Sequence, residues 1–219
     1  MLLDLPEIRS LTRLRRQFDQ FLEELPTGRF TPSKRLLEFW ELAGLYKPIA
    51  GGATGDVKKV YAASANLTVT NLHSIATSAT WVAGWESGTN DNTTNLYLDY
   101  RVTAKITVAA AGLSAGEIRM YSVCMLDDST WPDVFDGTES TETITDTEMR
   151  DAICKLAALS MTDTTNSDVY YLHCPSVAAV FGGNLPAKFV IFITHSTGQN
   201  LAAAGNQVTI KGSYVNVAA

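Results

Sequence analysis

The sequence has few of the residues that enzymes and redox proteins use most. Among its 219 residues there are three cysteines and three histidines. Cys124, Cys154 and Cys174 lie far apart, without a CxxC pair or any spacing typical of metal ligands. We therefore expect buried free thiols, in a protein made in a reducing cytoplasm.

Strong catalytic motifs are also missing. His73, His173 and His195 are widely separated, and none belongs to an H-E-x-x-H pattern. The run GLSAG at 112–116 matches the G-x-S-x-G nucleophile elbow, in which a helix follows the serine. Because a strand-like alternating run follows here, we favour a hairpin turn over a hydrolase that uses Ser114. We expect no enzyme and no cofactor.

The sequence contains neither a long apolar run nor a positive net charge. No run approaches the roughly 20 apolar residues that span a bilayer, and the start MLLDLPEIRS does not fit a signal peptide. Residues 1–48 carry 8 Lys/Arg and 7 Asp/Glu, whereas residues 49–219 carry 9 and 16. Because an acidic body repels phosphate backbones, neither a membrane nor nucleic acid is an expected partner.

The acids that are present gather in one segment. Nine of them fall between Asp127 and Asp151, with a single arginine. Asp127, Asp128, Asp133 and Asp136 have oxygens that Ca²⁺ accepts as ligands, but the EF-hand spacing is absent. We favour a solvated outward loop over a Ca²⁺ site.

Residues 1–48 have a helical pattern. Apolar residues recur at steps of three and four until Pro26 and Gly28 end the first helix, and Thr31 and Pro32 begin a second one. Residues 49–56 are then predicted to form a flexible linker. The apolar side chains of the two helices are expected either to fold back on the rest of the chain or to dock on a partner. They are Leu11, Leu14, Phe18, Phe21, Leu25, Leu36, Phe39 and Trp40.

Residues 57–219 change to a period of two, which is typical of strands. In the clearest strand, at 95–110, one face is predicted to carry Leu96, Leu98, Tyr100, Val102, Ala104, Ile106 and Val108. Further strand candidates are 65–72, 75–85, 117–126, 168–174, 188–195 and 207–217. Seven to nine strands without repeated helical crossovers predict a mainly β fold. It is an antiparallel, jelly-roll-like β-sandwich with an N-terminal two-helix appendage.

Three segments allow more specific predictions. In one interpretation Thr145 and Glu148 form the capping box of an inserted helix, and in the other CKLAALS at 154–160 forms a strand. Residues 175–181 are predicted to form a short helix that Gly182 or Gly183 ends in a left-handed conformation. The run at 189–193 is apolar on both faces, which predicts a strand in the middle of a sheet or at a subunit contact.

The tryptophans are predicted to have two different roles, in the core and in exposed contacts. Trp81 and Trp85 fall on one face of the same predicted strand, which favours a core position for both. Trp131, in the acidic segment, is the better candidate for an exposed contact. Exposed Trp131, Tyr97 or Trp85 would favour a module that binds carbohydrate or a receptor.

Residues 68–108 and 175–215, including NLYLDYRVTAKITV and SVAAVFGGNLPAKFVIFIT, resemble a family of small structural proteins of tailed bacteriophages. The likeness covers residues 65–215 and rests on strand and turn residues. It implies a virion protein made in the host cytoplasm. The implied partners are other virion proteins of the capsid, neck or tail, and further copies of the chain, as in a trimer.

The leading hypothesis is therefore a bacteriophage virion structural protein. It would be a head decoration, auxiliary or fibre-like protein anchored by the helices of residues 1–48. The alternative is a carbohydrate- or receptor-binding β-sandwich module of a phage tail or fibre.

Overall fold

A computed structural model describes residues 57–217 of the protein. The two predicted helices of residues 1–48, with the interface residues from Leu11 to Trp40, and the predicted linker at 49–56 lie outside the described residues.

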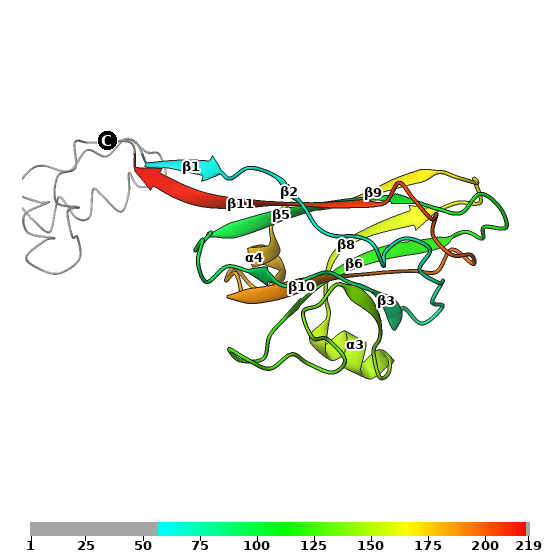
Figure 1. The fold of residues 1–219 in the computed structure, drawn as a ribbon, viewed down its shortest axis with the longest axis horizontal. Coiled ribbons are helices and arrows are strands. Elements are labelled where there is room, and N and C mark those ends of the chain that lie inside the picture. The colour runs from blue at the N-terminus through cyan, green and yellow to red at the C-terminus, as the bar shows by residue number, and fades with distance from the viewer. Residues whose placement is uncertain (1–56, 218–219) are drawn as a thin grey trace, which may run out of the picture. The chain divides into compact units, whose positions relative to one another are not determined.

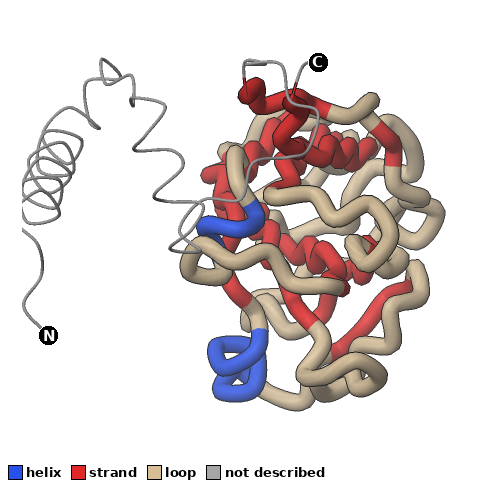
Figure 2. The backbone as a smooth tube through the Cα atoms, turned by 90° about the vertical axis from the view of Figure 1, so that its left-hand side faces the viewer, coloured by secondary structure: helices blue, strands red, loops and turns tan. Residues whose placement is uncertain are grey.

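The described residues form two antiparallel sheets, which confirms the mainly β prediction (Figure 1). The five-stranded sheet has the order β1 (Val57–Tyr61), β11 (Gln207–Val217), β5 (Asp99–Thr107) and β9 (Val169–Cys174), and β2 (Ala65–Asn66) also pairs with β11. The six-stranded sheet has the order β7 (Ser140–Thr143), β3 (Ala83–Glu86), β10 (Lys188–His195), β6 (Gly116–Cys124) and β8 (Lys155–Thr162), and β4 (Asn90–Asp91) also pairs with β10. The arrangement is sandwich-like, with two short helices beside the strands (Figure 2).

The main core lies between the two sheets. Alternation along β5 buries Val102, Ala104 and Ile106 completely, as predicted, because successive side chains of a strand point to opposite faces. The prediction is wrong for Leu96 and Leu98, which are 71% and 57% exposed. The strand begins only at Asp99, because Leu96 has a φ of +50° and belongs to the preceding turn.

Two predicted strands are much shorter than expected. Only Ala65–Asn66 of 65–72 and Ala83–Glu86 of 75–85 are in strands. Ser74 and Trp81 have φ values of +61° and +56°, a left-handed backbone that no regular strand contains. Trp85 is buried in the core as predicted. The prediction of a core position is wrong for Trp81, which is only half-buried. Arg119 Cζ lies 3.7 Å from the centroid of its ring.

The six-stranded sheet is covered on both faces. In its middle strand, β10, Phe189, Ile191 and Ile193 enter the main core, while Val190 and Phe192 enter a second core on the opposite face. This confirms the prediction of a central strand that is apolar on both sides. The second core consists of Tyr121, Val123, Phe135, Ile144, Cys154, Val190 and Phe192.

The acidic segment, residues 127–151, supplies part of this second core. Phe135 and Ile144 are 4% and 1% exposed, so the interpretation of the segment as only a solvated loop is wrong. Its apolar side chains cover the outer face of the six-stranded sheet, and its aspartates stay at the surface. Figure 1 shows α3 (Thr147–Ile153) on this side, away from the five-stranded sheet.

Residues 145–160, for which the sequence allowed either a helix or a strand, contain both: a helix followed by a strand. The helix α3 ends at Ile153 and β8 begins at Lys155. The predicted capping box is wrong, because the N-cap is Asp146, whose Oδ1 accepts a hydrogen bond of 2.7 Å from Met149 N. Thr145 instead donates its backbone N–H and its hydroxyl to the carboxylate of Asp133.

The helix α4 (Val177–Val180) ends as its glycines predict. Gly182 and Gly183 have φ values of +76° and +102°. Gly182 N donates to Ala179 O at 3.1 Å, and Gly183 N donates to Ala178 O at 2.8 Å. These two hydrogen bonds form a Schellman motif, so the paired glycine is a helix stop.

Candidate functional site

The GLSAG run forms the connection between β5 and β6. The strand β6 starts at Gly116 and no helix follows Ser114, so the geometry of a nucleophile elbow is absent from this turn. The backbone of Ser114 donates to Thr197 O at 2.9 Å. The predicted hairpin turn is wrong, because β5 and β6 belong to different sheets and this turn carries the chain from one sheet to the other.

The histidines of the described residues have separate, local partners. His195 is fully buried, with Nε2 3.2 Å from Ile75 O and Nδ1 3.0 Å from Thr197 Oγ1. Burial lowers its pKa to about 4. His173 Nδ1 lies 3.2 Å from Thr103 Oγ1 on the outside of the five-stranded sheet.

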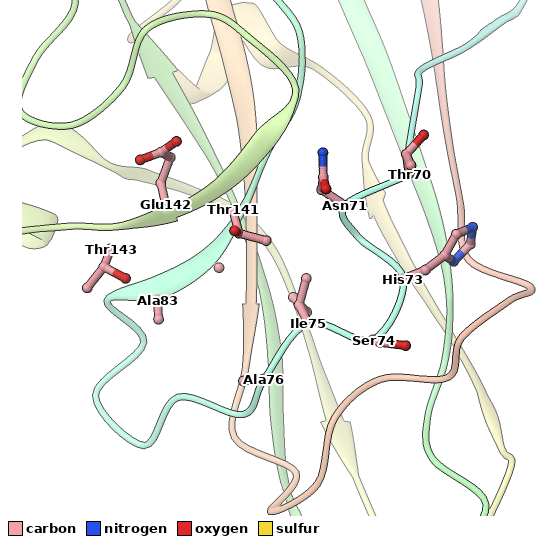
Figure 3. A pocket seen from close by; sticks show the side chains of 11 residues that line it. Thr70, Asn71, His73, Ser74, Ile75, Ala76, Ala83, Thr141, Glu142 and Thr143 are labelled. Atoms are coloured by element: carbon pink, nitrogen blue, oxygen red, sulfur yellow. The ribbon is translucent and has the colours of Figure 1, made fainter.

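A pocket of about 380 Å³ lies between the segment 70–76 and the strands β3 and β7 (Figure 3). Its lining residues include His73, Thr141, Glu142 and Thr143. Figure 3 shows His73 on the wall opposite Glu142. His73 Nδ1 lies 3.2 Å from Asn206 Nδ2, and Glu142 accepts from Ser140 Oγ at 2.6 Å. The pocket offers hydrogen bonds to a small polar molecule.

Glu139 fixes one end of this pocket. Its Oε1 accepts hydrogen bonds of 2.7 Å from both Asn71 N and Trp85 Nε1, and its Oε2 accepts one of 2.8 Å from Asn71 Nδ2. The carboxylate therefore ties the segment 70–76 to the buried ring of Trp85 and to the start of β7. Its role is to position the backbone.

Glu86 is the most perturbed carboxyl group of the described residues. It is fully buried on β3, where Gly137 N donates to Oε1 at 2.7 Å and Oε2 has no hydrogen-bond partner. Burial raises its pKa to about 7, against the opposing effect of the hydrogen bond from Gly137. Because Gly137 O accepts from Thr89 N, this one glycine links the acidic segment to β3 and to the turn that follows it.

Three of the four aspartates considered as Ca²⁺ ligands, Asp127, Asp133 and Asp136, accept hydrogen bonds from their own chain. Asp127 Oδ1 accepts from Ser129 N and Thr130 N, both at 2.7 Å, and Asp136 Oδ1 accepts from Thr138 N at 2.7 Å. These hydrogen bonds stabilise turns. Within residues 57–217 no three His, Cys, Asp or Glu side chains are grouped to hold a metal ion.

The cysteines are all free thiols. Cys154 and Cys174 are buried as expected, and burial raises the pKa of both, that of Cys154 to about 12. Cys124 is only half-buried, which corrects the expectation of three buried thiols.

The aromatic rings named for ligand contacts do not form an exposed platform. Trp85 is fully buried, while Trp131 and Tyr97 are half-buried. Tyr97 stacks on Tyr214 with the ring centroids 6.0 Å apart. Within residues 57–217 the exposed aromatic side chains are Tyr61 and Tyr171, at 52% and 66%, which the sequence pattern does not single out.

An exposed apolar row lies on β8, the last strand of the six-stranded sheet. Leu156, Leu159 and Met161 are 52%, 43% and 64% exposed, and we call these three residues the β8 patch. They sit beside β6 in the register Leu156↔Tyr121, Leu159↔Arg119 and Met161↔Glu117. The sequence pattern of this segment fits both a helix and a strand, so it does not show which side chains face outward.

Comparison with known proteins gives no relative: neither a family model nor a curated protein matches the chain. Within residues 57–217 no helix is long and apolar enough to cross a membrane.

Proposed function

We propose that the chain is a structural protein of a bacteriophage virion. It would be a head decoration, auxiliary or fibre-like protein that assembles with other copies of itself and with other virion proteins. Support comes from the resemblance of residues 68–108 and 175–215 to small phage structural proteins. The observation that carries the proposal is the β8 patch, which has the properties of a surface that another protein covers.

The strand β8 lies at the edge of the six-stranded sheet. One side of this strand pairs with β6, and no other strand of the described residues pairs with its second side. Exposed edge strands are usually protected by charge, proline or a bulge that twists them away. From Leu156 to Thr162 the strand carries no charged residue and no proline, and its bulge is opposite Met120 and Tyr121, near its start.

The outward side chains of this edge strengthen the argument. Leu156, Leu159 and Met161 expose apolar surface in a row, and burying such surface is favourable by about 25 cal/mol per Å². A neighbouring copy would satisfy the free backbone groups and the apolar side chains at once. In this proposal the two-sheet body associates with further copies of itself. The trimer expected from the sequence is one closed assembly that such contacts can form.

Two finer features belong to the proposal. One is a jelly-roll-like connection of the strands. The other is anchoring of the body to the particle through the two helices of residues 1–48, by the apolar residues from Leu11 to Trp40. The helical spacing of these residues supports an anchoring role.

The test is a deletion in particles assembled in the host. Full-length chain and a chain of residues 49–219 are expressed during assembly, and purified particles are analysed by quantitative mass spectrometry. Full-length chain should be present in a fixed copy number, and the shortened chain should be folded by circular dichroism but absent from particles. If full-length chain is absent from the particles, the virion proposal is wrong; if the shortened chain is incorporated equally, the anchor is wrong.

A further inference from the structure

A group of positive charges surrounds one exposed tyrosine on the outer face of the five-stranded sheet. Lys59 Nζ, Arg101 Cζ and Lys211 Nζ lie 5.5, 5.9 and 5.7 Å from the centroid of the Tyr61 ring. We call these four residues the Tyr61 cluster. They come from β1, β5 and β11, so the pairing of three strands brings them together.

The cluster is unusual because its cations have no acidic partners among residues 57–217. The ion pairs found within residues 57–217 use Arg119, Arg150 and Lys188, and none uses a cation of the cluster. Asp99, the carboxylate that precedes Arg101 by two residues on β5, accepts instead from Ala178 N at 2.9 Å. The positive charge of this surface is therefore not neutralised by the body itself.

The register makes this arrangement costly for the isolated body. Arg101 and Lys211 are direct partners across β5 and β11. Like charges directly opposite each other in an antiparallel pair are destabilising. The Tyr61 ring offsets part of this repulsion through cation–π attraction. A binding partner with negative charge would remove the rest.

The chain itself carries a surface of the opposite sign. Residues 57–217 contain 9 Lys/Arg and 15 Asp/Glu, and nine of these acids lie in the acidic segment. Seven of the nine are exposed, including Asp128 and Glu148. This segment covers the outer face of the six-stranded sheet, whereas the cluster is on the outer face of the other sheet, so the two charged surfaces lie on opposite sides of the body (Figure 1).

We propose that the Tyr61 cluster binds the acidic segment of a second copy of this chain. Opposite surfaces on one body give a heterologous, head-to-tail contact, which continues from copy to copy as a ring or a stack. The excess of negative charge on the body disfavours nucleic acid as the occupant, since a long polyphosphate would also meet the other acids. This contact differs from the one proposed for the β8 patch, which is apolar.

The experiment uses sedimentation velocity of the full chain at about 50 mM and about 500 mM NaCl, because salt screens exposed charge pairs strongly over this range. The mean sedimentation coefficient should fall as salt rises. Lys211→Glu should abolish this salt-dependent part, and the matched change Lys105→Glu, on β5 but outside the cluster and the acidic segment, should leave it. A contact through the β8 patch would persist at high salt, so the two proposals fail separately.

A charge exchange supplies the specific test. Arg101→Glu/Lys211→Glu and Asp128→Lys/Glu148→Lys should each lose the salt-dependent association, and an equimolar mixture should recover it, because each variant keeps the surface that the other has lost. Melting followed by circular dichroism checks that both variants fold. The proposal is overturned by wild-type protein whose association does not depend on salt, by equal effects of Lys211→Glu and Lys105→Glu, or by a mixture that does not associate.

Discussion

Glu86 and His195 are two buried titratable side chains of the six-stranded sheet. Relative to exposed groups, the pKa of Glu86 is raised and the pKa of His195 is lowered. Burial favours the neutral form of each: the protonated carboxyl of Glu86 and the neutral imidazole of His195. The contribution of His195 to stability is present above about pH 6.5 and is lost as the pH falls towards about 4. Glu86 contributes the opposite dependence.

The change Glu86→Gln tests the carboxyl group. Its folded pKa of about 7 exceeds the unfolded value of 4.5, so the folded state binds the proton more tightly and stability falls as the pH rises from about 4.5 to about 7. In the Gln variant this fall of about 3 kcal/mol should disappear from urea unfolding curves measured between pH 5 and pH 8. The exposed change Glu148→Gln should leave the fall in place, and an unchanged pH dependence in Glu86→Gln would contradict the assignment.

At the scale of single elements, the sequence predicts the strands that show side-chain alternation and the helix end that is formed by glycine. The local sequence is sufficient to predict β5 from Tyr100 onward, β6, β10, β11 and the glycine stop of α4. The alternation of side chains along a strand and the left-handed backbone of a glycine are both properties of a few neighbouring residues. The strands expected at 65–72 and 75–85 were not predictable in this way. Ser74, Trp81 and Leu96 adopt left-handed backbone without being glycine, and nothing in their local sequence signals it.

The two glycines after α4 give a clean test of this local control. A Cβ at Gly182 or Gly183 meets no atom within 4 Å, so alanine there costs only the strain of a positive φ. Gly182→Ala and Gly183→Ala should each lower the free energy of unfolding by about 1 kcal/mol. Gly88, which is equally open and has no positive φ, is the matched control, and Gly88→Ala should be neutral or stabilising by about 0.5 kcal/mol. Equal effects at all three positions would contradict a helix stop.

The edge strand β8 supports a second prediction at this scale. Leu159→Lys places a charge in the middle of the β8 patch without touching either core, so the monomer should unfold as the wild type does. Light scattering after gel filtration should show a smaller particle for Leu159→Lys than for the wild type. Lys155→Gln, at the start of the same strand, is the control and should keep the wild-type mass; a wild-type mass in both variants would contradict assembly through β8.

On the scale of the whole molecule, surfaces follow from strand pairing and could not be predicted from the sequence. The Tyr61 cluster combines residues as far apart in the chain as Lys59 and Lys211, which only the β1–β11–β5 pairing brings together. The same holds for the second core, where the acidic segment covers a sheet although its composition favours a solvated loop. Composition predicted the net charge of the body but not its separation onto two opposite faces.

A reconstruction of the intact particle tests the virion proposal most directly. The predicted result is density for the two-sheet body of residues 57–217 on the particle, at a fixed symmetric position, with Leu156, Leu159 and Met161 of β8 buried against a neighbouring copy. A particle of the same phage without this density, or with the body present and the β8 patch facing solvent, would contradict it.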